Sequence, residues 1–240
     1  TSMTKARLDP ALAAALDELC AAGRRDEAIR RLRQALEAGE EGFAGWLALS
    51  RLLFETGRFA NAVEANSRAE AADPLTDAFT EIQRTMQARA FDRAQQAARS
   101  MLAEAPGHPR AVYTLAHLAT SRGDHEAAVK ILEDGLAHGP ANLALRRFLV
   151  SALEQSGAYT EAVQAARLCA ELDASFEALW GLITLLLRYG LNEEALAACD
   201  RASRLAGSDA GKHGALALVR GQALRVLGRR DESVSALRAS

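Results

Sequence analysis

The chain has 240 residues, of which 49% are hydrophobic and 25% are charged, so it can bury a core and is not of the disordered class. Its formal net charge is −2, and no overall basic field is therefore expected to draw it to nucleic acid or to an anionic membrane. Aromatic residues make up only 5%, while Ala and Leu dominate the apolar residues. This composition favours packed helices over sheets.

A short phrase recurs along the chain: a Gly or a residue in its place, four further residues, and then a small residue. The small residues that end the seven phrases are separated by 34, 32, 34, 34, 33 and 38 positions: Ala28, Ala62, Ala94, Ala128, Ala162, Ala195 and Ser233. Each part of the phrase has a physical role. Gly ends one helix in a left-handed conformation, acidic residues begin the next helix, and the small residue lets the two helices lie close together.

The phrases carry a family resemblance. The tetratricopeptide repeat follows the pattern W-x2-L-G-x2-Y, then A-x3-F, then P. The second unit reads W-x2-L-S-x2-L from Trp46, then Ala62-x3-Asn66, then Pro74. The fourth unit reads V-x2-L-A-x2-A from Val112, and the third has Arg89 in place of the turn Gly. Residues 9–240 thus resemble an array of tetratricopeptide repeats.

We therefore predict an all-α fold, a right-handed α-solenoid of about seven stacked helix-turn-helix units without a boundary between domains. Residues 1–8 are interpreted as a cloning remnant and an N-terminal lead-in, and residues 9–240 as the superhelix. The wider spacing before Ser233 predicts a longer loop over residues 207–214. The predicted repeats are 9–42, 43–74, 75–108, 109–142, 143–175, 176–213 and 214–240.

The C-terminal end of this array is predicted to be uncapped. The chain stops inside the second helix of the seventh unit, so Leu227, Val234 and Leu237 would face an absent neighbour. This predicts either a longer native protein or a contact between chains that covers the end.

No pattern for catalysis, metal or cofactor binding is found. The three cysteines, Cys20, Cys169 and Cys199, form no disulfide framework and favour a reducing, cytoplasmic compartment. The five histidines lack metal-ligand spacing. The longest apolar run, residues 178–187, is shorter than the roughly 20 residues that span a bilayer, so it predicts a buried helix and no membrane insertion. We predict no catalytic residues, no metal and no cofactor.

The family resemblance implies a concave groove lined by the first helices of successive repeats. Helical spacing agrees, because the implied positions fall on one side of each helix. The groove would carry a row of Arg beside aromatic anchors, which suits an extended peptide that is acidic or ends in a carboxylate. An alternative is that these charges only solvate the surface and that Phe54 and Trp180 belong to the core. The implied groove residues are Arg51, Phe54, Phe79, Gln83, Arg110, Tyr113, His117, Arg147, Glu154, Trp180, Arg188 and Arg225.

Three functional hypotheses remain open. The first is a non-catalytic protein–protein interaction scaffold that binds an extended peptide or partner segment in its concave groove, as the family resemblance implies; a mainly structural spacer is its plainer form. The second is the N-terminal repeat domain of a larger bacterial enzyme, of the sulfotransferase or aspartyl/asparaginyl hydroxylase type, because residues 213–232 resemble the last repeats before such a catalytic domain. The third is self-association through exposed end repeats.

Overall fold

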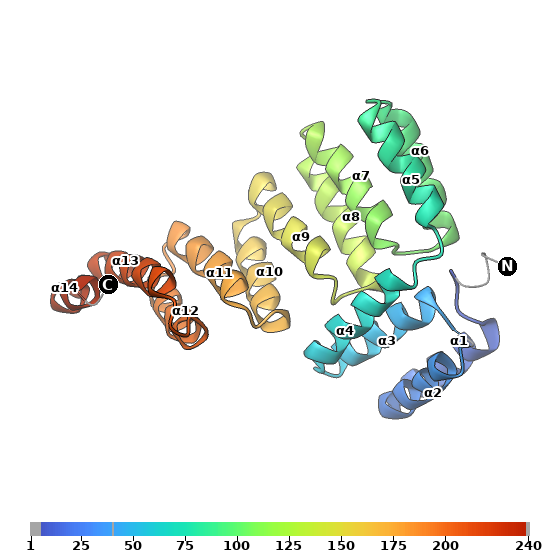
Figure 1. Ribbon diagram of the computed structural model, residues 1–240, viewed down its shortest axis with the longest axis horizontal. Helices are drawn as coiled ribbons and strands as arrows, with labels where there is room; N and C mark the ends of the chain where they lie inside the picture. Colours follow the sequence, from blue (N-terminus) through green and yellow to red (C-terminus); the bar gives the residue numbers. More distant parts are fainter. Residues whose placement is uncertain (1–5, 40, 239–240) are drawn as a thin grey trace. The chain divides into compact units, whose positions relative to one another are not determined.

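A computed structural model describes residues 6–39 and 41–238, and within these residues every regular element is a helix (Figure 1). Helices that follow one another in the chain pack mostly as antiparallel pairs, which confirms the predicted all-α solenoid. The fourteen helices of the described residues are α1 (Pro10–Ala21), α2 (Arg25–Glu37), α3 (Phe43–Glu55), α4 (Phe59–Ala71), α5 (Thr76–Gln87), α6 (Phe91–Glu104), α7 (Pro109–Ser121), α8 (His125–His138), α9 (Leu143–Ser156), α10 (Tyr159–Leu172), α11 (Phe176–Arg188), α12 (Asn192–Leu205), α13 (Ala210–Val226) and α14 (Arg230–Arg238).

The recurring phrase acts as the sequence predicts. The small residue of the phrase is inaccessible in the first five units, where Ala28, Ala62, Ala94, Ala128 and Ala162 are each 0% exposed. The turn glycines take positive φ angles, from 72° at the first to 84° at the fifth. The third unit keeps the same turn with a residue for which that conformation is sterically unfavourable. Its Arg89 has a φ of 54° and is the one non-glycine residue with positive φ in the described chain.

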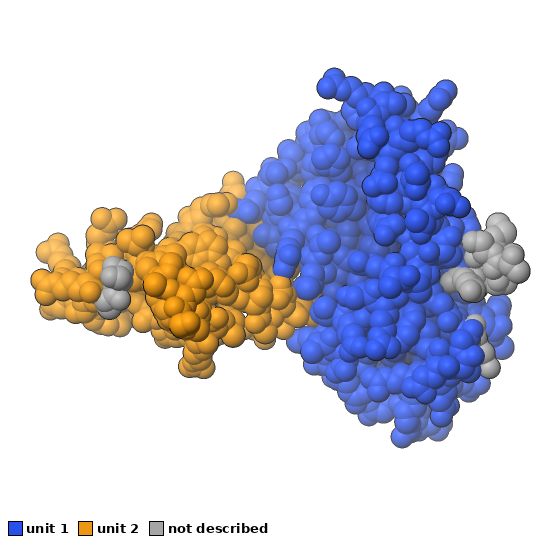
Figure 2. Space-filling model, viewed as in Figure 1, with its two compact units in different colours: residues 1–156 blue, residues 157–240 orange. Residues whose placement is uncertain are grey.

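The chain folds into two compact units, residues 1–156 and residues 157–240 (Figure 2). The boundary follows α9 and precedes α10, so it falls inside the predicted repeat 143–175. This differs from the expectation of an array with no internal boundary. The single superhelix over residues 9–240, with its seven repeats, stays a prediction.

In unit 1 the α3/α4 pair departs from a simple stack, because α3 contacts α8 as well as its chain neighbours (Figure 1). The Phe43 ring stacks on the ring of His108 at a centroid distance of 5.0 Å. The guanidinium of Arg146, at the start of α9, lies 5.0 Å from the ring centroid of Phe54. The α3/α4 pair therefore docks against the segments that lead into α7 and α9.

The N-terminal segment of unit 1 joins the same junction. Ala6 is buried in one core cluster with Phe43, Leu47 and Met101. The side chain of Arg7 donates hydrogen bonds to the carbonyls of residues 103 and 104, at the end of α6. Residues 6 and 7 thus pack between α3 and the end of α6, whereas residues 1–5 of the predicted N-terminal segment lie outside the described residues.

In unit 2 the structure contradicts one prediction made from the sequence. The predicted longer loop over residues 207–214 is wrong, because α13 already begins at Ala210. The carboxylate of Asp209 accepts a hydrogen bond from the backbone N–H of Lys212 and so caps that helix. The insertion is accommodated by a helix of 17 residues rather than by a loop.

The apolar side chains expected at the end of the array are partly exposed. Val234 is 48% and Leu237 is 43% exposed, while Leu227 is half-buried. Leu237 nevertheless packs against Gly221 of α13, whose missing side chain leaves room for it.

Candidate functional site

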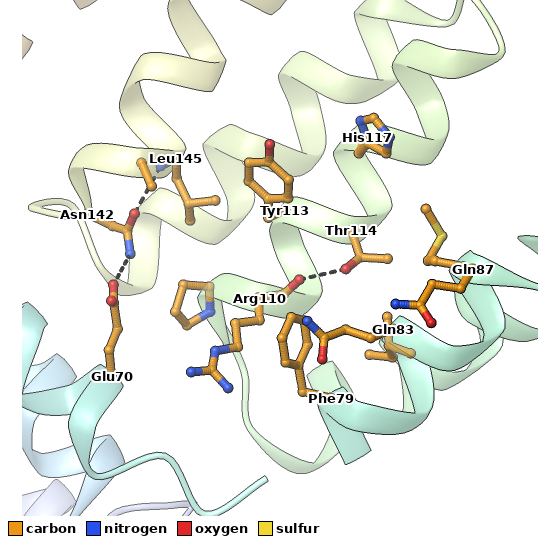
Figure 3. Close-up of a pocket in the computed structure, with 14 residues that line it drawn as sticks. Glu70, Phe79, Gln83, Gln87, Arg110, Tyr113, Thr114, His117, Asn142 and Leu145 are labelled. Atoms are coloured by element: carbon orange, nitrogen blue, oxygen red, sulfur yellow. Dashed lines mark hydrogen bonds between the residues drawn. The ribbon is translucent and has the colours of Figure 1, made fainter. Parts of the chain in front are cut away.

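A pocket of about 420 Å³ lies in unit 1 on the side of α5 and α7, and it is closed by the end of α4 and the start of α9 (Figure 3). Most of its walls therefore come from the first helices of three successive pairs. The lining residues are Glu70, Phe79, Ile82, Gln83, Met86, Gln87, Pro109, Arg110, Tyr113, Thr114, His117, Asn142, Ala144 and Leu145.

The apolar wall is built from aromatic and aliphatic side chains. Tyr113 is 49% exposed, and its ring contacts Phe148 at a centroid distance of 5.1 Å and His117 at 6.4 Å. Phe79 lies opposite on α5 and supports the guanidinium of Arg110, which sits 4.7 Å from its ring centroid. An exposed aromatic side chain held by such contacts can bind an apolar group with little loss of side-chain entropy.

Arg110 owes its position to a buried carboxylate. Its Nη1 lies 3.3 Å from Oδ2 of Asp73, whose side chain is only 4% exposed. The other carboxylate oxygen of Asp73 lies 2.9 Å from Nε2 of His108, which is 1% exposed. It also accepts a hydrogen bond from the backbone N–H of Leu75. Buried charges need such partners, so these contacts fix the segment between α4 and α5 against the start of α7.

Glu70 forms the opposite rim of the pocket. Its Oε1 accepts hydrogen bonds from Nδ2 of Asn66 at 3.1 Å and from Nδ2 of Asn142 at 2.9 Å. Oδ1 of Asn142 in turn accepts from the backbone N–H of Leu145 and caps the start of α9 (Figure 3). Residues 72 positions apart in sequence are thereby joined across the pocket.

Five of the twelve sequence-predicted groove residues come together here: Phe79, Gln83, Arg110, Tyr113 and His117. They share the first-helix positions on which the prediction was based. That these five residues bind a ligand stays a prediction, and the pocket gives the place where that ligand would lie.

The other predicted residues lie elsewhere. In unit 1, Arg51 lines a separate cavity of about 250 Å³, and Phe54 packs under Arg146 and against Phe59. Arg147 and Glu154 lie on α9 outside the pocket. Unit 2 holds the remaining three predicted residues, Trp180, Arg188 and Arg225; the Trp180 ring stacks on Phe176 at 6.0 Å.

Sequence reasoning missed Glu70, Asn142 and Leu145. The family resemblance implies groove residues only on the first helix of each pair. Glu70, in contrast, lies in the last turn of the second helix of its pair, and Asn142 precedes a helix. Asn before a helix is a recognisable capping signal, but its contact with Glu70 has no local signature. The expected row of Arg does not gather here, since only one of its members, Arg110, lines the pocket; the others are Arg51, Arg147, Arg188 and Arg225.

The rest of the described chain shows no site for metal chemistry. Among residues 6–39 and 41–238, no three His, Cys, Asp or Glu side chains gather so that they could hold a metal ion. Within the same residues, none of the helices has the length and apolar character needed to cross a membrane. Burial raises the pKa of the Cys199 thiol to about 11, which keeps it protonated and unreactive.

Comparisons with solved structures show what the fold resembles. The chain superposes on MamA with a TM-score of 0.54 at 18% identity, covering 68% of this chain and 88% of MamA. It superposes on YrrB, described as a TPR protein with an unusual peptide-binding site, with a TM-score of 0.53 at 19% identity, covering 75% of this chain and 89% of YrrB. The TPR-like repeats of a putative kinesin light chain from Podosopora anserina give a TM-score of 0.51 at 18% identity, covering 69% and 92%.

The comparison with curated proteins gave no match. Two sequence models of the tetratricopeptide repeat match the chain, one over residues 10–75 and the other over residues 85–142. These matches agree with the helix pairs and with the structural likenesses. The chain belongs to the tetratricopeptide repeat family, whose repeats form protein-interaction scaffolds.

Proposed function

We propose that this protein is a non-catalytic scaffold whose unit 1 binds an extended peptide segment of a partner protein in the pocket between α5, α7 and α9. The observation that carries the proposal is the pocket itself, with exposed Tyr113 facing Phe79 across a cavity of about 420 Å³. That volume lies within the range of about 300–1,000 Å³ that is usual for ligand pockets.

The chemistry of the walls supports a peptide as the ligand. Aromatic side chains supply most of the energy in many interfaces, and Tyr113 and Phe79 offer such anchors. Gln83 and Gln87 on α5 place amide donors and acceptors along the same wall, where they can meet the polar backbone of a peptide. YrrB, which shares the fold, is described as having a peptide-binding site, and we extend that property to this chain.

The test compares two exposed tyrosines, each in contact with a second aromatic ring. Tyr113 lines the pocket, whereas Tyr159 in unit 2 is 52% exposed and contacts Tyr189. Short random peptides displayed on phage are selected on the intact chain, and a fluorescent copy of an enriched peptide is titrated with each variant. Tyr113→Ala should weaken binding by about tenfold or more, because a hot-spot aromatic is lost, and Tyr159→Ala should leave it unchanged.

Failure to enrich any peptide would contradict the proposal. So would equal affinity of the wild type and Tyr113→Ala at an unchanged helical circular dichroism signal.

Several finer expectations stay predictions. A preference for acidic or C-terminal carboxylate-bearing peptides rests on the row of Arg, and cytoplasmic location rests on cysteine usage. The hypothesis of a repeat domain within a larger sulfotransferase or hydroxylase rests on a short resemblance, and the native reading frame tests it. Self-association through the ends rests on the exposed apolar side chains of α14, and sedimentation across a concentration series tests it.

A further inference from the structure

The charged groups around the pocket are unequally compensated. Of its fourteen lining residues, the only members of the Asp, Glu, Lys and Arg set are Glu70 and Arg110. The positive charge of Arg110 is balanced by the buried carboxylate of Asp73. Glu70 has amide partners only: within the described residues, no cationic group lies within ion-pair distance of its carboxylate. The unbalanced charge at the pocket is therefore negative.

The carboxylate of Glu70 is also held in a fixed orientation. Its two donors, Asn66 and Asn142, are 4% and 2% exposed, so both amides are locked by the surrounding packing. Both donate to the same oxygen, Oε1, which leaves Oε2 without a hydrogen bond from the described protein. Glu70 further lies in the last turn of α4, where the backbone carbonyls add negative potential. A cation placed here meets a preorganised acceptor.

We propose that the pocket recognises a peptide segment in which an apolar side chain stands beside a Lys or Arg. The apolar side chain enters between Phe79 and Tyr113, and the cation pairs with Oε2 of Glu70. This inference rests on the proposed function and names its ligand class. For this pocket it replaces the acidic peptide expected from the row of Arg, because Arg110 is already paired.

Glu70 also joins α4 to the start of α9, and a purely structural role would explain the same contacts. Glu70→Gln separates the two roles, since the amide oxygen of Gln can still accept from Asn66 and Asn142 while the charge is gone. Glu64→Gln is the matched control. Glu64 lies on the same helix, is exposed, and pairs with Arg68 outside the pocket.

The experiment uses the intact chain and the phage-displayed random peptides described above. Enriched peptides should carry Lys or Arg within two positions of an aromatic or branched aliphatic residue. A fluorescent synthetic copy should bind Glu70→Gln about tenfold more weakly than wild type, as expected for loss of a charge-assisted hydrogen bond. It should bind Glu64→Gln as it binds wild type. A copy with Gln in place of its Lys or Arg should bind wild type and Glu70→Gln equally.

Each of the following outcomes refutes either this inference alone or both this inference and the proposed function. Enrichment of acidic or C-terminal carboxylate peptides whose binding depends on Tyr113 refutes this inference and leaves the proposed function standing. Basic peptides that bind Glu70→Gln as tightly as wild type refute it as well. Should Glu70→Gln fail to fold, the Lys-to-Gln peptide series on wild type decides, and equal affinities refute the inference. Failure to enrich any peptide refutes both proposals.

Discussion

Gly135 of α8 lies directly against Val112 of α7, and replacing it tests how tightly this pair is packed. A Cβ atom at Gly135 would lie 2.5 Å from Cγ1 and 2.6 Å from Cγ2 of Val112. Val112 is 2% exposed, and a β-branched side chain in a helix has essentially one χ1 rotamer. It cannot turn away, so Gly135→Ala must push the two helices apart.

Two effects of opposite sign set the magnitude. Within a helix, Ala is more favourable than Gly by about 1 kcal/mol. Overpacking of a core costs about 1–3 kcal/mol, and two carbon contacts well below 3 Å place this site in the upper part of that range. The net effect of Gly135→Ala on the free energy of unfolding is therefore a loss of about 1–2 kcal/mol.

Gly181 offers the same substitution without the clash. It lies inside α11 of unit 2, and a Cβ atom there would meet no atom within 4 Å. Gly181→Ala should therefore raise stability by about 1 kcal/mol through helix propensity alone. Urea unfolding followed by circular dichroism measures both changes, with the transition of each unit compared to wild type because repeat arrays unfold as coupled local units.

The decisive comparison is the sign of the change in the free energy of unfolding that each of the two substitutions causes. If Gly135→Ala stabilised the chain as Gly181→Ala is expected to, the close approach of α7 and α8 would be refuted. Val112→Ala tests the cause, because it removes both clashing methyl groups. In the double variant, the loss caused by Gly135→Ala should shrink by at least about 0.5 kcal/mol, as coupled neighbouring sites do.

Two further predictions concern the turn of the third unit and the buried thiol. Arg89→Gly should raise the free energy of unfolding by about 1 kcal/mol in urea titrations, because a left-handed backbone costs a non-glycine residue about that much; an unchanged or lower midpoint would contradict it. Cys199 should react with a thiol reagent at about pH 8 far more slowly than half-buried Cys20, since a pKa of about 11 leaves little thiolate; equal rates in single-cysteine variants would contradict it.

The fold was predictable because interactions between residues close in sequence determine each repeat. A left-handed Gly, an acidic first turn and a small packing residue each act over a few residues, and their period gives the helix pairs. Residues 207–214 show the limit of that reasoning, since the wider spacing by itself predicts a loop, whereas Asp209 is a good N-cap and begins a helix there. Considering the cap as well as the period would have predicted the longer α13.

The candidate site was predictable only where it follows the same period. Phe79 and Tyr113 occupy equivalent first-helix positions of successive repeats, Arg110 lies one helical turn before Tyr113, and all three line one pocket. Glu70 and Asn142 meet through the docking of α3/α4 on α8 and on the start of α9, a contact between elements far apart in the chain. A repeat pattern describes only contacts between neighbouring units, so it cannot predict a contact of this kind.

Asp73 gives a physical reason for that docking. Its carboxylate is buried in the segment that follows α4, and a buried charge is tolerated only with partners, so the chain beyond it must bring His108 and Arg110 to that point. The same contacts orient Arg110 over Phe79 and carry the end of α4, with Glu70, to the rim of the pocket. The groove of a regular array is open along its length, whereas here α4 closes one side. The pocket is therefore bounded and carries a fixed carboxylate, and Asp73, which anchors this geometry through His108 and Arg110, is absent from the pocket lining.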